Sequence, residues 1–94
     1  MIRVLILPRL RKTAGRLPAD VRLKAQTALV AVAAAFGNPH AHSGLGLRKL
    51  ARRSYEIRVH LHWRIVFIHD GDTLVAYDLM THDEVARWLR GQRK

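Results

Sequence analysis

The 94-residue sequence contains no cysteine, which excludes disulfide bonds, thiol nucleophiles and cysteine-based zinc sites. It also lacks long hydrophobic runs. The longest, Ala28–Phe36, has nine residues and is too short to cross a bilayer. The apolar segment at residues 1–7 is followed at once by Pro8 and Arg9, which is not the pattern of a secretory signal. These absences predict a cytoplasmic protein that does not contact a membrane.

Acidic residues are scarce. Seven Asp and Glu stand against 17 Lys and Arg, most of them arginine, and the formal net charge is +10. Such a chain attracts polyanions, and arginine favours bidentate contacts with phosphate and carboxylate groups. The hydrophobic content of 49% is enough for a folded core, and the length suits one domain covering residues 1–94. A basic surface without a specific ligand is the simpler alternative.

Hydrophobic periodicity predicts an α+β fold. Helical composition covers Pro18–Phe36, and a period of two begins near Leu47. Asp70-Gly71 predicts a hairpin turn, and residues 81–84 form a capping box at the start of a last helix. Residues 9–16 fit a short helix or a loop, and residues 40–46 are expected to form a loop. The expected strands are residues 2–7, a segment from Leu47, residues 55–61, the apolar run 63–68 and residues 73–79.

Three cationic side chains are expected to converge at one end of the sheet. If the chain turns back near Leu61, Arg58 faces Arg64 on the neighbouring strand. A turn centred on Asp70-Gly71 would place Arg64 opposite Tyr77 and Asp78, with His82 emerging at the same end. Like charges in facing positions are destabilising, so an anionic ligand is the simplest reason to retain them. His82 could act as general acid or base there, or it could simply occupy the first helical position.

Other basic and histidine-bearing segments allow two interpretations. The run Arg48, Lys49, Arg52 and Arg53 could bind RNA phosphates, or it could be a solvated loop. His60 and His62 share a strand face, but no third metal ligand is evident, so a polar hairpin edge is the better interpretation.

The motifs between Leu45 and Leu89 together resemble those of RelE/ParE-type toxins of bacterial toxin–antitoxin systems. They are, in order, Gly-Leu-Arg-Lys-Leu, Tyr-Glu-Ile-Arg-Val, Trp-Arg-Ile-Val-Phe, the Asp-Gly turn and His-Asp-Glu-Val. The resemblance implies helices packed on a curved, mainly antiparallel sheet with a short C-terminal helix. It further implies a type II toxin that is held inactive by an acidic antitoxin. The toxin–antitoxin complex could assemble into larger complexes.

The same resemblance implies an mRNA endoribonuclease that acts at the ribosome and inhibits translation. Arg58, Arg64 and His82 match catalytic positions of the family, and the chemistry needs neither a metal ion nor a cofactor. Ribonuclease members often place a tyrosine near the C-terminus, where this chain has Ala86 and Trp88. The carboxylate base of one subgroup has Glu56 as its nearest counterpart. Two alternatives therefore stay open: a ParE-like toxin that inhibits DNA gyrase without nuclease activity, and an inactive relic that binds RNA or protein.

Overall fold

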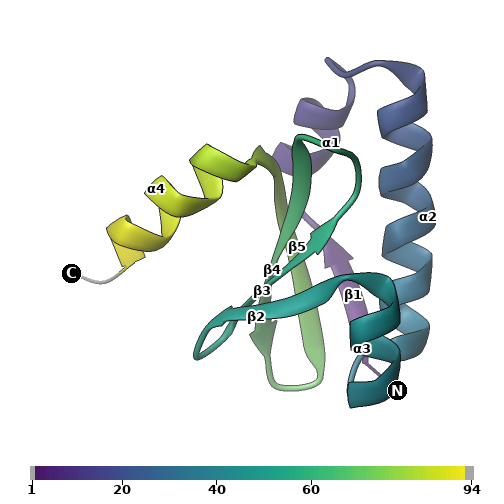
Figure 1. Cartoon of the computed structure of the whole chain (residues 1–94), viewed down its shortest axis with the longest axis vertical. Coiled ribbons are helices and arrows are strands. Elements are labelled where there is room, and N and C mark those ends of the chain that lie inside the picture. Colours follow the sequence, from purple (N-terminus) through teal and green to yellow (C-terminus); the bar gives the residue numbers. More distant parts are fainter. Residues whose placement is uncertain (1, 93–94) are drawn as a thin grey trace.

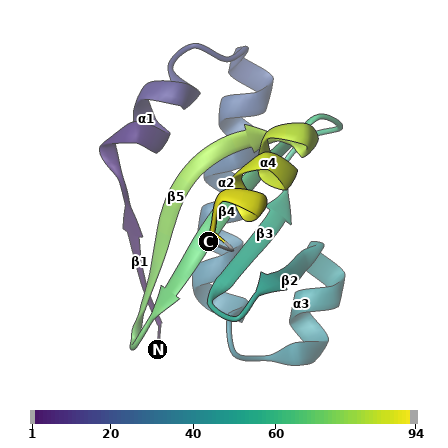
Figure 2. The same ribbon diagram turned by 90° about the vertical axis from the view of Figure 1, so that its left-hand side faces the viewer.

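The computed structural model describes residues 2–92, which form one five-stranded sheet with helices on both faces (Figures 1 and 2). Helix α2 lies against one face of the sheet, and the C-terminal helix α4 lies against the other. The elements, in chain order, are β1 (Arg3–Ile6), α1 (Pro8–Ala14), α2 (Ala19–Ala35), α3 (Pro39–Leu45), β2 (Leu47–Ala51), β3 (Ser54–Arg58), β4 (Trp63–Asp70), β5 (Thr73–Thr81) and α4 (His82–Gln92).

The sheet has the order β1-β5-β4-β3-β2 and is mainly antiparallel, because only β1 pairs parallel with its neighbour β5. The predicted α+β class is therefore confirmed. Strand β4 occupies the middle of the sheet, and Ile65, Val66 and Phe67 are completely buried. Consecutive strand residues face opposite sides, so burial of all three means that both sides of β4 are covered. The sequence prediction for this apolar run is confirmed.

The larger core lies between the sheet and α2. Val21, Ala25 and Val32 of α2 are buried, and they belong to the same cluster as Ile57 and Phe67 of the sheet. The buried helix positions follow the spacing of one helical face, which the sequence predicted. The basic segment after β1 forms the helix α1, which begins at a proline in its first turn.

A smaller core lies on the other face of the sheet, beneath α4. Val66 and Met80 of the sheet pack against Val85 of α4, with Trp88 at the edge of this cluster. The predicted capping box is confirmed: the Thr81 backbone N–H donates to Glu84 Oε1 (2.8 Å), and the Glu84 N–H donates to Thr81 Oγ1 (3.2 Å). The cap fixes where the chain leaves β5 and turns into the helix.

The pairing of β4 with β5 differs from the prediction. Arg64 faces Met80 instead of Tyr77 and Asp78. Two local features account for the shift. The two-residue turn is Gly71–Asp72, with Gly71 at a φ of 61°, and Tyr77 is an extra residue between the pairs Val66–Asp78 and Phe67–Ala76. This β-bulge adds one more position and turns neighbouring side chains toward the same face.

The loop predicted at residues 40–46 is wrong, because Pro39–Leu45 is the helix α3. Its His42 ring packs on Phe36 with 5.4 Å between ring centroids, and His42 Nε2 accepts a hydrogen bond from the Gly37 N–H (3.0 Å). These contacts with the end of α2 stabilise a short helix of low intrinsic propensity. Among residues 2–92, none of the helices combines the length and the apolar character needed to cross a lipid bilayer.

Candidate functional site

Arg58 and Arg64 are register partners on adjacent strands. Their strand neighbours Ile57 and Ile65 belong to the core under α2, so strand alternation places the two arginines on the opposite face, which carries α4. Arg58 is the last residue of β3 and also lines a pocket beside α2. Arg58 is exposed, whereas Arg64 retains only 9% of its accessible surface. The structure therefore brings together the two arginines that the sequence placed in one cluster, but it gives them different surroundings.

Arg64 is anchored to the loop that joins β3 and β4. Its Nη1 donates to the carbonyl oxygens of His60 (3.3 Å), Leu61 (3.5 Å) and Trp63 (3.2 Å). These contacts hold the guanidinium in one orientation. The carbonyls of His60 and Trp63 also accept backbone N–H groups within the turn, so Arg64 reinforces a turn that is already hydrogen-bonded. Among residues 2–92, Arg64 Nε and Nη2 donate to no protein group, so this edge of the guanidinium can still donate hydrogen bonds to a ligand.

His82 lies at the same end of the sheet, immediately after the Trp63–Thr81 pair. It is exposed and lines an open pocket of about 370 Å³ together with His62, Thr81 and Asp83. His62 comes from the β3–β4 loop that Arg64 anchors. Two histidines thus share a pocket at the end of the sheet where Arg64 lies, and neither Arg58 nor Arg64 lines that pocket. His62 was not among the site residues predicted from the sequence.

A buried carboxylate lies on the same sheet face. Glu56 is 5% exposed, and its Oε2 is 2.7 Å from Nε of Arg48, which lies opposite it on β2. Arg48 side-chain exposure is 67%, so its guanidinium reaches both the carboxylate and solvent. The ion pair holds Arg48 on the face that carries Arg58.

The rest of the predicted RNA-binding run is split by the fold. Lys49 is exposed on the edge strand β2, next to Arg48. Arg52 and Arg53 occupy the β2–β3 turn, at the end of β3 that is remote from Arg58. Arg53 donates to the carbonyl oxygen of His69 (3.1 Å) and to Asp70 Oδ1 (2.9 Å), so it ties two turns together. Arg48 lies on the sheet face of Glu56, whereas Lys49 pairs with Tyr55 and alternates to the other face. Arg52 and Arg53 lie at the remote end of β3.

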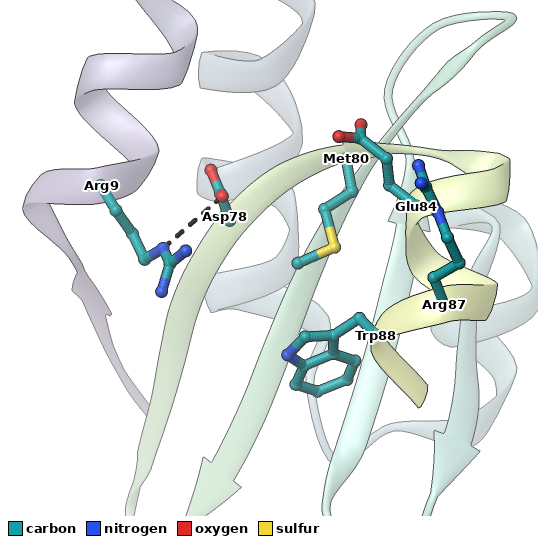
Figure 3. A pocket seen from close by; sticks show the side chains of 6 residues that line it. All are labelled: Arg9, Asp78, Met80, Glu84, Arg87 and Trp88. Atoms are coloured by element: carbon teal, nitrogen blue, oxygen red, sulfur yellow. Dashed lines mark ion pairs between the residues drawn. The ribbon is translucent and has the colours of Figure 1, made fainter. Parts of the chain in front are cut away.

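A second cleft, of about 460 Å³, lies beside β5 and was missed by the sequence analysis (Figure 3). One of its walls is held by Asp78, which pairs with Arg9 (3.5 Å) and accepts a hydrogen bond from Thr13 (2.7 Å). Arg9 also lies over the Tyr77 ring, 4.4 Å from its centroid. The acidic residue in an otherwise apolar strand was the available sequence signal. The lining side chains are Arg9, Asp78, Met80, Glu84, Arg87 and Trp88.

The remaining histidines have structural surroundings. His69 packs edge-on against Phe36, with 5.0 Å between ring centroids. His60 lies 3.8 Å from Asp20, and its buried Nδ1 has no hydrogen-bond partner among the described residues. Within residues 2–92, no group of three or more histidine or carboxylate side chains is arranged to hold a metal ion.

Comparison with known proteins identifies the family. The profile described as the ParE-like toxin domain matches residues 19–85, more than two-thirds of the chain. The chain belongs to the ParE-like toxin domain family. A sequence search of the curated proteins finds no match.

Solved structures share the fold of this toxin domain. A chain of the RelB–RelE antitoxin–toxin complex from Methanococcus jannaschii aligns with a TM-score of 0.68 and 16% identity, over 89% of this chain and 96% of that chain. The RelE–RelB complex from Pyrococcus horikoshii gives 0.65 and 15%, over 85% and 93%. The YoeB/ParE toxin from Agrobacterium tumefaciens gives 0.61 and 17%, over 86% and 99%. Identities this low establish a common fold and leave the chemistry to the side chains.

Proposed function

We propose that this toxin domain is an endoribonuclease that cleaves mRNA at the ribosome and thereby inhibits translation. The observation that supports this function best is the facing pair Arg58–Arg64, with His82 leaving the sheet at the same end. Two guanidinium groups on one face form a site for a phosphate, and an adjacent exposed imidazole can transfer a proton.

In the proposed reaction, the ribose 2′-oxygen attacks the adjacent phosphorus, and the bond from phosphorus to the 5′-oxygen breaks. The products are a 2′,3′-cyclic phosphate and a 5′-hydroxyl. Arginine stays protonated and is a poor base, so neutral His82 accepts the 2′-hydroxyl proton, and the departing 5′-oxygen takes it back from the resulting imidazolium. Arg58 and Arg64 stabilise the charge on the phosphoryl oxygens. Arg64 is suited to this task because its Nη1 is already anchored and little reorganisation is needed.

The proposed partner is an acidic cognate antitoxin. The +10 charge attracts an acidic polypeptide as well as RNA, so the two ligands would compete for one surface. The solved complexes from Methanococcus jannaschii and Pyrococcus horikoshii contain RelE together with RelB. By analogy, this toxin would act in the cytoplasm and be held inactive in a toxin–antitoxin complex, which could assemble further.

The test is primer extension on an mRNA under translation in a cell-free system. The wild-type protein should produce cuts positioned by codons, and these cuts should disappear with Arg58→Ala and His82→Ala. Asp72→Asn, in the turn at the opposite end of the sheet, is the control and should cut normally. Intact mRNA with the wild-type protein would refute the nuclease.

A second candidate function is inhibition of DNA gyrase. The family description, ParE-like, favours it. So does the hydrogen bond from Arg64 Nη1 to the β3–β4 loop, because that nitrogen then has a structural role and is less available to a phosphate. Loss of supercoiling and trapped gyrase–DNA complexes, with mRNA left intact, would support it. If neither mRNA nor supercoiling changes, the domain is an inactive RNA- or protein-binding relic.

A further inference from the structure

The cleft beside β5 has the composition of a site for a nucleic acid base. Figure 3 shows Arg9 and Asp78 on one side, with Glu84, Arg87 and Trp88 extending from α4 on the other. Its volume of about 460 Å³ lies in the range of ligand pockets, and it is open to solvent. Met80, which is 7% exposed, contributes an apolar surface between the two sides.

Trp88 supplies an aromatic surface on which a base could stack. It is half-buried, and its ring packs against Tyr77 with 5.6 Å between centroids. The contact with Tyr77 orients the indole, because a side chain packed against another ring loses much of its rotational freedom. Exposed aromatic side chains on basic proteins commonly bind unstacked bases of single-stranded RNA.

The charges at the rim favour a base over a phosphate. Two guanidinium groups and two carboxylates line the cleft, so its formal charge is zero in a protein of charge +10. Carboxylates repel a phosphate, whereas a base edge carries both hydrogen-bond donors and acceptors. The cleft therefore offers both kinds of partner to a neutral, planar ligand.

Two of these four groups remain available for a ligand. Asp78 is already satisfied by Arg9, Thr13 and the Leu79 N–H. Glu84 uses Oε1 for the helix cap, and its Oε2 has no hydrogen-bond partner among residues 2–92. Arg87 likewise forms no ion pair within the described part of the chain. One free carboxylate oxygen and one free guanidinium thus lie one helical turn apart on α4.

Guanine matches this pair. It presents the acceptors O6 and N7, which suit a guanidinium, and the donors N1–H and N2–H, which suit a carboxylate. Adenine and cytosine lack the two adjacent donors that guanine presents at N1 and N2, and uracil lacks an amino group. Met80 is the register partner of Arg64, so the cleft is one strand away from the proposed phosphate site. A nucleotide adjacent to the scissile phosphate would reach it, because neighbouring strands are about 5 Å apart.

We infer that the cleft formed by Glu84, Arg87 and Trp88 binds a guanine base next to the cleaved phosphate, which gives the toxin a sequence preference. This inference rests on the proposed ribonuclease function for its biological meaning. The binding itself can be measured without cleavage. Glu84 and Arg87 are then specificity-determining residues, and Trp88 is the stacking surface.

The test uses the four 2′-O-methyl trinucleotides 5′-UXU-3′, in which X is A, C, G or U and the blocked 2′-hydroxyl prevents cleavage. Trp63→Phe leaves Trp88 as the single tryptophan, since the chain has two. Its fluorescence should be quenched by the guanine trinucleotide at a concentration about tenfold lower than by the others, as one bidentate base contact allows. The Trp88→Phe variant, with Trp63 alone, should show no selective quenching.

Glu84→Gln is the decisive variant. Glutamine can still accept the Thr81 N–H and preserve the cap, but its amide then directs a donor toward the donors of guanine. The guanine preference should disappear. Asp72→Asn makes the same change of charge in a distant turn and should retain the preference.

Equal affinity for all four trinucleotides, or a guanine preference that survives Glu84→Gln, would overturn the inference. The two proposals can fail separately. If Arg58→Ala abolishes mRNA cleavage and Trp88 still selects guanine, both stand. Selective quenching by a protein that never cleaves mRNA would leave the base site in place without the ribonuclease. Cleavage of mRNA without selective quenching of Trp88 would support the ribonuclease and overturn the base site.

Discussion

Replacement of Arg64 by methionine should affect stability and catalysis separately. Methionine keeps an unbranched apolar stem but removes the Nη1 contacts with the carbonyls of the β3–β4 loop. A hydrogen bond from a charged donor contributes about 1.5–3 kcal/mol. The three contacts share one nitrogen and are long, at 3.2–3.5 Å, so we count them as one good bond of about 2 kcal/mol.

Part of this loss is offset, because the substitution also removes a buried charge that faces Arg58. We expect a net loss of about 1–2 kcal/mol in the free energy of unfolding, which lowers Tm by roughly 5–15 °C for a domain of this size. The matched variant Arg58→Met changes an exposed side chain and should stay within about 0.5 kcal/mol of wild type.

Thermal unfolding followed by circular dichroism measures the first effect. Cleavage of translated mRNA, assayed well below both Tm values, measures the second, and both variants should be inactive. An Arg64→Met protein with the same Tm as the wild type would refute a stabilising role for the contacts between Arg64 and the β3–β4 loop. If that variant is destabilised yet cleaves normally, Arg64 is a structural residue, and the phosphate site depends on Arg58 and His82.

Three further substitutions test other parts of the face that carries α4. Arg48→Ala should cost about 1–2 kcal/mol in urea unfolding, since buried Glu56 loses its 2.7 Å partner while solvent still reaches the pair, and Glu56→Gln in the same chain should restore most of it. Asp78→Ala should cost about 2–3 kcal/mol, because two charge-assisted hydrogen bonds are lost. Thr13→Val, which removes one of them, should cost about half as much; equal losses would contradict this network. Thr81→Ala should cost about 1 kcal/mol through loss of the helix cap, and Thr81→Ser should restore it.

The sequence predicts the structure best where a local pattern has one structural solution. The alternation around Ile57 and the apolar run of β4 predicted the hairpin and its register, including Arg58 opposite Arg64. The capping box predicted the start of α4. Each of these features involves residues close in the chain, so the pattern and the contact are nearly the same information.

The sequence predicts least where a contact depends on segments that are separated in the chain. The turn at Gly71–Asp72 and the bulge at Tyr77 together moved the partner of Arg64 to Met80, and a bulge has no clear local signal in this strand. Helix α3 was missed because its stabilising contact, His42 on Phe36, comes from packing against α2. Composition alone predicted a loop there.

The sequence by itself determined the α+β class, the central position of β4 and the meeting of two arginines at one end of the sheet, because hydrophobic periodicity and strand pairing are local properties. Only the tertiary structure decided how those groups can be used. Burial turned Arg64 into an anchored cation. The cleft formed because α1 reaches Asp78 across 65 residues of chain while α4 folds back over β5. Long-range packing of this kind depends on the whole core, and no single segment encodes it.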